Sequence, residues 1–209
     1  AAKDIERVLH VRKVLGDDID ILTDANTAYT IADVRRVLPV LAEIKAGWLE
    51  EPFACSDFAS YREAAKITSP VPIAAGENHY TRFEFAQLLE AGSIRIWQPD
   101  LSKCGGITEG LAIAALASAH RIPMNTHSSA TGLNHAATIH FASAIENTQY
   151  FEACVSHYNP LRDMFGVSFE IGQDGCVEPI DKPGIGIEVD ESIFAKYPLI
   201  DGPGYVVKF

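Results

Sequence analysis

Basic residues are scarce in this 209-residue sequence, which carries 17 lysines and arginines against 28 aspartates and glutamates, for a net charge of −11. Nucleic acids and anionic membranes are bound through clusters of lysine and arginine. We therefore expect neither as a partner. No stretch approaches the roughly 20 uninterrupted apolar residues of a membrane span, and no signal-peptide pattern opens the sequence. The sequence predicts a cytoplasmic protein that acts on a small molecule.

Cysteine is also rare, and its four copies lie far apart. Cys55, Cys104, Cys154 and Cys176 form no C-x-x-C pair, so neither a zinc site nor a dense disulfide framework is indicated. Free thiols in a reducing cytoplasm fit this spacing. The composition, 47% hydrophobic and 22% charged, is that of one globular domain or most of one.

A repeated pattern of strand, loop and helix fills most of the chain. Helical patterns cover residues 2–15, 34–44, 57–67, 82–91, 107–120 and 133–145, and short apolar runs predict strands over 19–22, 47–49, 71–75, 94–97, 123–126 and 150–151. Strict alternation of strands and helices is typical of a parallel sheet with right-handed crossovers. Pro39 lies inside the helix predicted at 34–44 and should kink or split it.

Six chemically reactive side chains follow these strands at intervals of 23 to 27 residues: Asp24, Glu50, Glu77, Asp100, His127 and Glu152. The carboxyl ends of parallel strands meet at one mouth of a (β/α) barrel, where such folds build their active sites. An open Rossmann-like sheet is the rival architecture. It usually has a glycine-rich phosphate loop after its first strand, and the single Gly105-Gly106 pair is weak evidence for one.

The predicted barrel is incomplete within this chain. A closed barrel needs eight strands, and the helix at 2–15 presupposes a strand before it. We expect residues 1–165 to hold the third to eighth strands with their helices, and the N-terminal part of the barrel and an α+β capping domain to lie outside the chain. We expect residues 166–209 to form a second region. In it, Gln173-Asp174-Gly175 predicts a hairpin turn, and we expect the tail from 183 to return to the capping domain.

The first three strand ends predict a metal site. The carboxylates of Asp24, Glu50 and Glu77 would converge in the barrel mouth and repel one another unless a cation lay between them. Oxygen ligands favour a hard ion. Mg²⁺ fits best, because three monodentate carboxylates leave half of an octahedron for water and substrate.

The next strand ends predict proton transfer. Asp100 can accept a hydrogen bond from His127, fix the tautomer of the imidazole and raise its pKa toward that of a working base. Glu152 would face the metal across the mouth and, if protonated, could donate a hydrogen bond to a substrate oxygen. These are the candidate catalytic residues.

Every one of these residues also has an ordinary structural explanation, such as a turn or a charged strand exit. Their shared placement in six consecutive units favours a functional site. Five neighbouring side chains are candidates for orienting the ligands or contacting substrate: Asn26, Glu51, Asn78, His79 and Lys103.

Several linked segments resemble the enolase superfamily, specifically its mandelate racemase-like branch. They are Thr23-Asp24-Ala25-Asn26, Trp48 to Pro52, Gly76-Glu77-Asn78, Gln98 to Gly106, Asn125-Thr126-His127 and Pro183 to Ile187. The lysine base of the muconate lactonizing branch would fall five residues before the glycine pair, where this sequence has Asp100. The mandelate racemase-like branch is therefore favoured, and with it a modified (β/α)7β-type barrel.

The resemblance implies Mg²⁺-assisted abstraction of the proton α to a carboxylate, through an enediolate intermediate. It assigns the metal ligands to Asp24, Glu50 and Glu77, the dyad to Asp100 and His127, and the donor to the substrate carboxylate to Glu152. That enolase-type sites pair a lysine or histidine base with Mg²⁺ is a general pattern. The family's usual second base, a Lys-x-Lys segment, is not found before Asp24.

We expect dehydration of an acid sugar to a 2-keto-3-deoxy acid, by an enzyme that is a homo-oligomer. The alternatives are a racemase, epimerase or cycloisomerase of the same branch, and a non-catalytic protein that lacks the second base. A zinc-dependent hydrolase on a similar barrel would be expected to offer an early His-x-His pair, and none is visible.

Overall fold

The structure, a computed structural model, describes residues 1–128, 131–157, 159–164 and 169–198. Its sheet has four parallel strands that neighbour one another in chain order: β1 (Thr23–Asp24), β2 (Leu49–Glu50), β3 (Ile73–Ala75) and β4 (Ile94–Trp97). The helices are α1 (Ala2–Leu15), α2 (Ile31–Glu43), α3 (Phe58–Ala64), α4 (Thr81–Ala91), α5 (Leu101–Cys104), α6 (Gly106–Ala119), α7 (Gly132–Ala144), α8 (Pro160–Asp163) and α9 (Ser192–Lys196).

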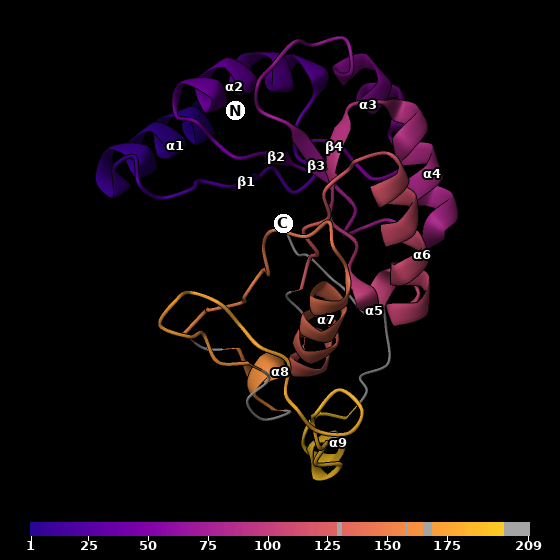
Figure 1. Ribbon diagram of the computed structural model, residues 1–209. Coiled ribbons are helices and arrows are strands. Elements are labelled where there is room, and N and C mark those ends of the chain that lie inside the picture. The colour runs from indigo at the N-terminus through magenta and orange to yellow at the C-terminus, as the bar shows by residue number, and fades with distance from the viewer. Residues whose placement is uncertain (129–130, 158, 165–168, 199–209) are drawn as a thin grey trace.

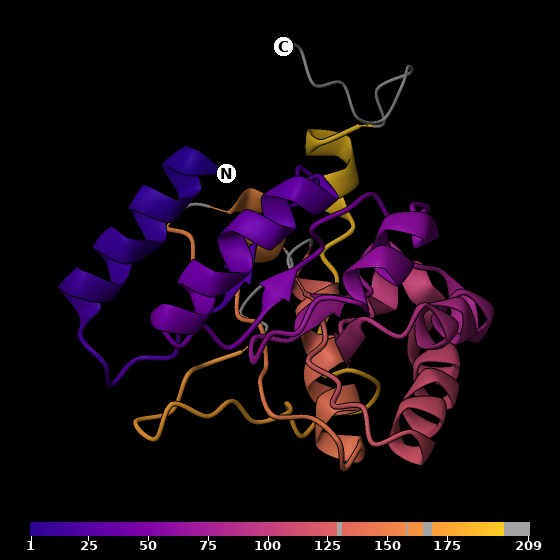
Figure 2. The same ribbon diagram turned by 90° about the horizontal axis from the view of Figure 1, so that it is seen from above.

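The sheet curves, with its helices on the outer side. Figure 1 shows α1 to α4 and α6 following one another around an arc outside the strands, and Figure 2 shows the same order from above. The main core lies between strands and helices. On the inner face, Trp48, Ala74 and Ile96 form a second small cluster. Two hydrophobic layers on opposite faces of one parallel sheet are typical of a (β/α) barrel wall.

Helix α2 illustrates how the outer layer is specified. Thr30 caps its first turn in a capping box with Asp33, and buried side chains follow at i, i+3, i+4 and i+7 from Val34. Of the two effects expected of Pro39, a kink or a split, the split is absent, because α2 continues through this residue. Proline removes one backbone donor and crowds the carbonyl four residues earlier, but the buried face on both sides of Pro39 keeps the helix packed.

Except for β4, the strands are shorter than the apolar runs predicted. Of residues 19–22, Ile21 accepts a hydrogen bond from the Gly47 backbone at 2.8 Å, and the ladder itself begins at Thr23. The run at 123–126 joins the sheet through a single parallel bridge between Trp97 and Met124. Residues 150–151 lie in no strand. Apolar character identifies buried segments, whereas a strand also needs a backbone partner on consecutive residues.

Two side-chain contacts connect the far ends of this arc. The Tyr150 hydroxyl donates to Asp20 Oδ2 at 2.7 Å. The same ring packs edge-on against Trp48, with ring centroids 5.7 Å apart. The segment before Glu152 is thereby held against the approach to β1.

The C-terminal region is sparsely structured. The predicted hairpin is present in minimal form, as an antiparallel bridge between Ile171 and Val177. Helix α9 was not expected. The proposed boundary between residues 165 and 166, and residues 199–209 of the tail, lie outside the described residues, so the two-region division stays a prediction.

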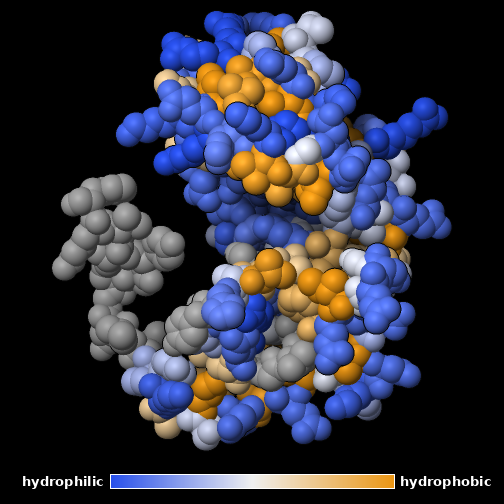
Figure 3. Space-filling view, turned by 90° about the vertical axis from the view of Figure 1, so that its left-hand side faces the viewer, coloured by the Kyte–Doolittle hydropathy of each residue, from blue (hydrophilic) through white to orange (hydrophobic). Residues whose placement is uncertain are grey.

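Helix α1 buries none of its residues. It is fixed to α2 by Arg12, whose Nε donates to the Ile44 carbonyl at 2.8 Å, while Val14 is 67% exposed. Figure 3 shows hydrophobic side chains exposed among hydrophilic ones on this open side of the arc, with a hollow between its upper and lower parts. Every helix in the described part of the chain is too short or too polar to cross a membrane.

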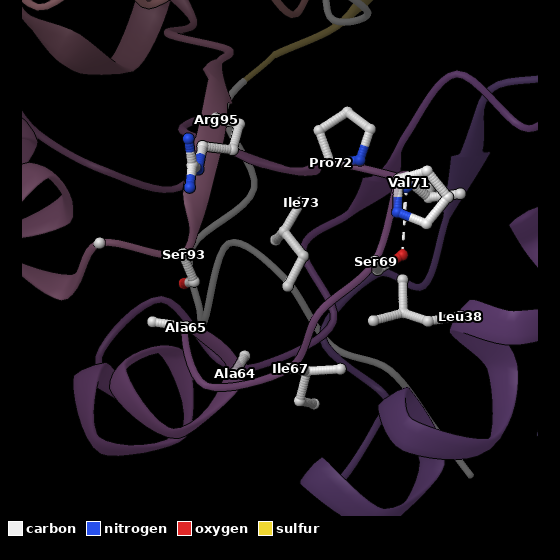
Figure 4. A pocket seen from close by; sticks show the side chains of 12 residues that line it. Leu38, Ala64, Ala65, Ile67, Ser69, Val71, Pro72, Ile73, Ser93 and Arg95 are labelled. Carbon is white, nitrogen blue, oxygen red and sulfur yellow. Dashed lines mark hydrogen bonds between the residues drawn. The ribbon is translucent and has the colours of Figure 1, made fainter.

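A cavity of about 300 Å³ lies where β3 and β4 begin, at the opposite end of the strands from the six reactive side chains. Figure 4 shows Ile73, Ser93 and Arg95 around it. Its wall includes Ala65 and Gly92, the C-cap residues that follow α3 and α4. In barrels this end of the sheet serves stability, whereas chemistry is placed at the other end.

Gly76, directly after β3, lies close to the backbone of Gln98, directly after β4. Its φ is +149°, and a Cβ there would lie 2.7 Å from the Gln98 backbone nitrogen. We expect Gly76→Ala to lower the free energy of unfolding by about 2–4 kcal/mol, from backbone strain and overpacking together. Gly92→Ala is the matched control, because Gly92 has a φ of +75° and meets only the Ala65 Cβ at 4.0 Å. Urea unfolding measures both variants, and equal decreases in their free energy of unfolding would contradict this account.

Candidate active site

Strand register brings the predicted side chains together. Asp24 and Glu50 are direct partners in the β1 and β2 ladder. Trp97 and Met124 are bridge partners, and Asp100 and His127 each lie three residues beyond them. Parallel strands in this register carry both side chains to the same height at the carboxyl end of the sheet.

His127 is held between two carboxylates. Its Nδ1 lies 2.7 Å from Asp100 Oδ2, and its Nε2 lies 2.8 Å from Glu77 Oε2. Burial opposes protonation of His127, but the hydrogen bonds to Asp100 and Glu77 and the charges of Glu77 and Glu152 outweigh it and raise its pKa to about 10. The imidazole is therefore protonated at neutral pH and donates a hydrogen bond from each nitrogen. The predicted dyad is present, with Glu77 as an additional partner.

Asp100 is fully buried and hydrogen-bonded on every side. Its Oδ1 accepts from the backbone nitrogen and hydroxyl of Ser102, at 2.7 and 2.5 Å, and from Asn134 Nδ2 at 3.1 Å. Burial raises the pKa of Asp100, but the bonds from His127 and Ser102 more than offset it, so the net pKa is lowered. Asp100 also caps the short helix α5. A carboxylate fixed in this way can orient its histidine without taking up the proton.

Glu50 is the most perturbed of the predicted metal ligands. Burial raises its pKa to about 7; hydrogen bonds from Gln98 and Trp48 oppose this, whereas the charges of Asp24 and Glu152 add to it. Gln98 Nε2 and Trp48 Nε1 both donate to Glu50 Oε2, at 2.6 and 3.1 Å. Neither donor was predicted as a site residue. Each lies two positions before a predicted residue, which places it on the same face of the strand, and that spacing is the signal that could have found them.

Asp24 and Glu152 are the first and the last of the six reactive side chains in chain order. Asp24 is exposed and accepts from the backbone and side chain of Asn26, at 2.7 and 3.4 Å. Glu152 Oε2 accepts from the Ser128 backbone at 3.1 Å. Burial raises the pKa of Glu152, and the charges of Glu77 and Asp24 raise it further against the opposing effects of His127 and Ser128. The shift favours the protonated form that a hydrogen-bond donor requires.

The remaining candidates gather beside Glu77. Asn78 Nδ2 lies within hydrogen-bond distance of both Glu51 and Glu77, and Lys103 Nζ lies 3.1 Å from Asn78 Oδ1. His79 is only 1% exposed, and its Nε2 lies 3.1 Å from the Cys55 carbonyl oxygen. Of the two roles considered for His79, orienting its neighbours suits this burial, and substrate contact does not.

The chemistry of the donor set fits a divalent cation. Asp24, Glu50 and Glu77 offer only oxygen ligands, and the charges of Asp24 and Glu152 raise the pKa of Glu50, so negative charge accumulates at this edge. Among the described residues, however, no three histidine, cysteine, aspartate or glutamate side chains are already arranged to hold a metal ion. Glu77 instead accepts from His127. The ligand set thus stays a prediction.

Comparison with known sequences identifies sugar-acid enzymes as relatives. Arabinonate dehydratase from Saccharolobus solfataricus is 33% identical over 196 residues, covering 93% of this chain and 52% of that protein. D-galactonate dehydratase from Xanthomonas euvesicatoria is 32% identical, covering 92% and 51%. D-galactarolactone cycloisomerase from Agrobacterium fabrum is 30% identical, covering 95% and 54%. The chain thus spans about half the length of the relatives it matches.

Solved structures share the fold. A member of the enolase superfamily from Polaromonas sp. JS666 has a TM-score of 0.93 and 80% identity, covering 99% of this chain and 55% of that chain. A racemase from Streptomyces coelicolor, solved with bound magnesium, has a TM-score of 0.78 and 29% identity, covering 93% and 51%. Residues 1–193 match the family described as Enolase C-terminal domain-like, which confirms the barrel fold class. This chain belongs to that family, in the mandelate racemase-like branch of the enolase superfamily.

Proposed function

We propose that the protein containing this chain abstracts the proton α to a carboxylate and dehydrates an acid sugar to a 2-keto-3-deoxy acid. The observation that carries this proposal is the imidazole of His127 between Asp100 at 2.7 Å and Glu77 at 2.8 Å. Asp100 fixes the imidazole through Nδ1, and Nε2, which contacts Glu77 here, would be available to a reacting group once Glu77 holds the cation. The names of two dehydratase relatives support the choice of reaction.

The overall step removes one water molecule from a 2,3-dihydroxy acid. A base takes the proton from C2, an enediolate forms, the hydroxyl leaves C3 with a proton, and the resulting enol becomes the 2-keto acid. His127 could take the C2 proton once it is neutral, or, in its protonated form, donate to the departing hydroxyl. Its pKa, which is raised to about 10 when no Mg²⁺ is bound, favours the second role.

Other residues would bind and orient the substrate. Glu152, with its raised pKa, would donate to a carboxylate oxygen of the substrate. Asp24, Glu50 and Glu77 would hold Mg²⁺, which when bound supplies positive charge against the negative charge that develops on the substrate carboxylate. Gln98 and Trp48 would keep Glu50 in place through their hydrogen bonds.

A racemase, epimerase or cycloisomerase is the second candidate, because a cycloisomerase is also among the relatives. It would use the same residues and the same first step. Retention of all oxygen atoms in the product distinguishes it from a dehydratase.

The test is α-proton exchange in D₂O, followed by NMR across a library of aldonic and aldaric acids with the full-length protein and Mg²⁺. We expect exchange together with loss of water and appearance of a 2-keto-3-deoxy acid. Exchange without loss of water would transfer the proposal to the second candidate. Absence of both exchange and turnover for every acid would overturn it.

The protonation of His127 provides a pH-dependent prediction. In full-length protein without added Mg²⁺, we expect its imidazole to titrate near pH 10 rather than near the ordinary 6.5. Because the pKa is raised by folding, the stabilisation is fully present below pH 6.5 and is lost as the pH rises toward 10. Mg²⁺ should lower this pKa, since its charge opposes the imidazolium and it competes for Glu77. An NMR titration of the imidazole that is unchanged by Mg²⁺ would contradict the assignment.

A further inference from the structure

Three polar side chains form a hydrogen-bonded group beside Glu77, apart from the proton-transfer pair. We call Glu51, Asn78 and Lys103 the amide module. Glu51 follows β2, Asn78 follows β3 and Lys103 lies in α5. The amide module therefore joins three consecutive connections at the carboxyl end of the sheet.

Glu51 is the anchor of the amide module. It is 1% exposed, and both of its carboxylate oxygens accept hydrogen bonds from Asn78. Oε1 accepts from the Asn78 backbone nitrogen at 3.3 Å, and Oε2 accepts from Asn78 Nδ2 at 2.7 Å. Glu51 also has a φ of +29°, a conformation that a non-glycine residue keeps only where its surroundings enforce it.

The side-chain amide of Asn78 is completely matched to its partners. Nδ2 donates to Glu51 Oε2 at 2.7 Å and to Glu77 Oε1 at 2.8 Å, which uses both of its hydrogens. Oδ1 accepts from Lys103 Nζ at 3.1 Å. Turning the amide by 180° would set its oxygen against two carboxylates and its hydrogens against an ammonium group. The charges on both sides thus fix its orientation.

This arrangement distinguishes the two oxygens of Glu77. Oε1 is held by Asn78, whereas Oε2 faces His127 Nε2 at 2.8 Å. We propose that Asn78 is a positioning residue, which fixes the Glu77 carboxylate through Oε1, so that Oε2, which contacts His127 in this structure, is the oxygen for which a divalent cation would compete. Glu51 and Lys103 act through it by fixing the amide. This inference rests on the proposed function, in which Glu77 is a Mg²⁺ ligand.

The test replaces Asn78 with leucine, which has a similar size but neither donates nor accepts. Loss of a partner that orients a metal ligand typically costs about 10- to 100-fold in metal affinity. In full-length protein we expect the Mg²⁺ dissociation constant, measured by calorimetry, to rise by that factor. The turnover number at saturating Mg²⁺ should change much less. Asn78→Ser, which keeps one donor, should fall between the wild type and Asn78→Leu, and it provides the measurement if the leucine variant does not fold.

Asn147→Ala is the matched control. Asn147 is also half-buried, and its Nδ2 donates to the Ile122 carbonyl at 3.1 Å, at the opposite end of the strand segment. It should leave Mg²⁺ affinity unchanged, even if it lowers the melting temperature. If both Asn78 variants bind Mg²⁺ as tightly as the wild type while Glu77→Ala does not, the positioning role is overturned and the proposed function stands. If the folded wild-type protein binds no Mg²⁺, the proposed metal site and this inference both fail.

Discussion

Replacing His127 with asparagine is expected to lower kcat/KM for the acid-sugar substrate by about 10²- to 10⁴-fold, the range that a positioned acid or base contributes. Asparagine occupies similar space but cannot exchange a proton near neutral pH. Both carboxylate contacts, at 2.7 and 2.8 Å, depend on ring nitrogens that the variant lacks. Steady-state kinetics over a pH series measures the loss.

The metal site provides the internal control for this variant. His127 is not among the predicted ligands, so calorimetry should show that His127→Asn still binds Mg²⁺. His140→Asn is the matched substitution, because His140 lies in α7 and not among the residues of the candidate site. Exchange kinetics of His127→Asn equal to those of the wild type would remove His127 from the reaction.

Replacing Glu77 with alanine should abolish Mg²⁺-dependent activity while leaving the protein folded. Loss of an outer partner costs up to about 100-fold in metal affinity, and loss of a direct ligand should exceed that. Glu77 is only half-buried, so its removal opens no large cavity in the core. Calorimetry with Mg²⁺ and a thermal melt separate the two effects.

Glu146→Ala is the control for the Glu77 variant, because Glu146 is exposed and follows α7. It should match the wild type in metal affinity and activity. If Glu77→Ala kept both, Glu77 would leave the ligand set. Unfolding of the variant would instead reveal a structural role, in which case Glu77→Gln, which keeps the shape and one oxygen, becomes the informative variant.

The sequence predicts the longer helices well, because they depend on local patterns, and it predicts the order of the four strands better than their bounds, since β1 begins only after the run at 19–22. Helix α1 at Ala2–Leu15 and strand β4 at Ile94–Trp97 have the expected bounds, since apolar periodicity and the flanking Gly92 and Pro99 define them. The run at 123–126 is less regular than expected. Its apolar residues indicate that it is buried. Whether it pairs as a strand depends on the backbone of the neighbouring segments, which no local pattern encodes.

The sequence analysis named the reactive side chains and some of the residues that contact them, such as Asn78, but it missed others, such as Gln98 and Trp48 beside Glu50. His127 and Asp100 could be paired from their spacing after adjacent strands. The hydrogen bond between His127 and Glu77 could not, because it depends on a side-chain rotamer. Helix α5 was also missed, since four residues between Asp100 and Gly105 carry too little periodicity to be recognised. Its capping aspartate is the residue that was assigned to chemistry.

Pairing of the strands in chain order has a consequence for folding kinetics. Each ladder closes a connection of only about one repeat, and the entropic cost of closing such a loop is modest. The sheet can therefore grow one unit at a time as the chain leaves the ribosome. The bond between Tyr150 and Asp20 spans 130 residues and has to wait for the intervening units. Asp24 and Glu152, at the two ends of the row, should thus be the last of the six reactive side chains to become neighbours.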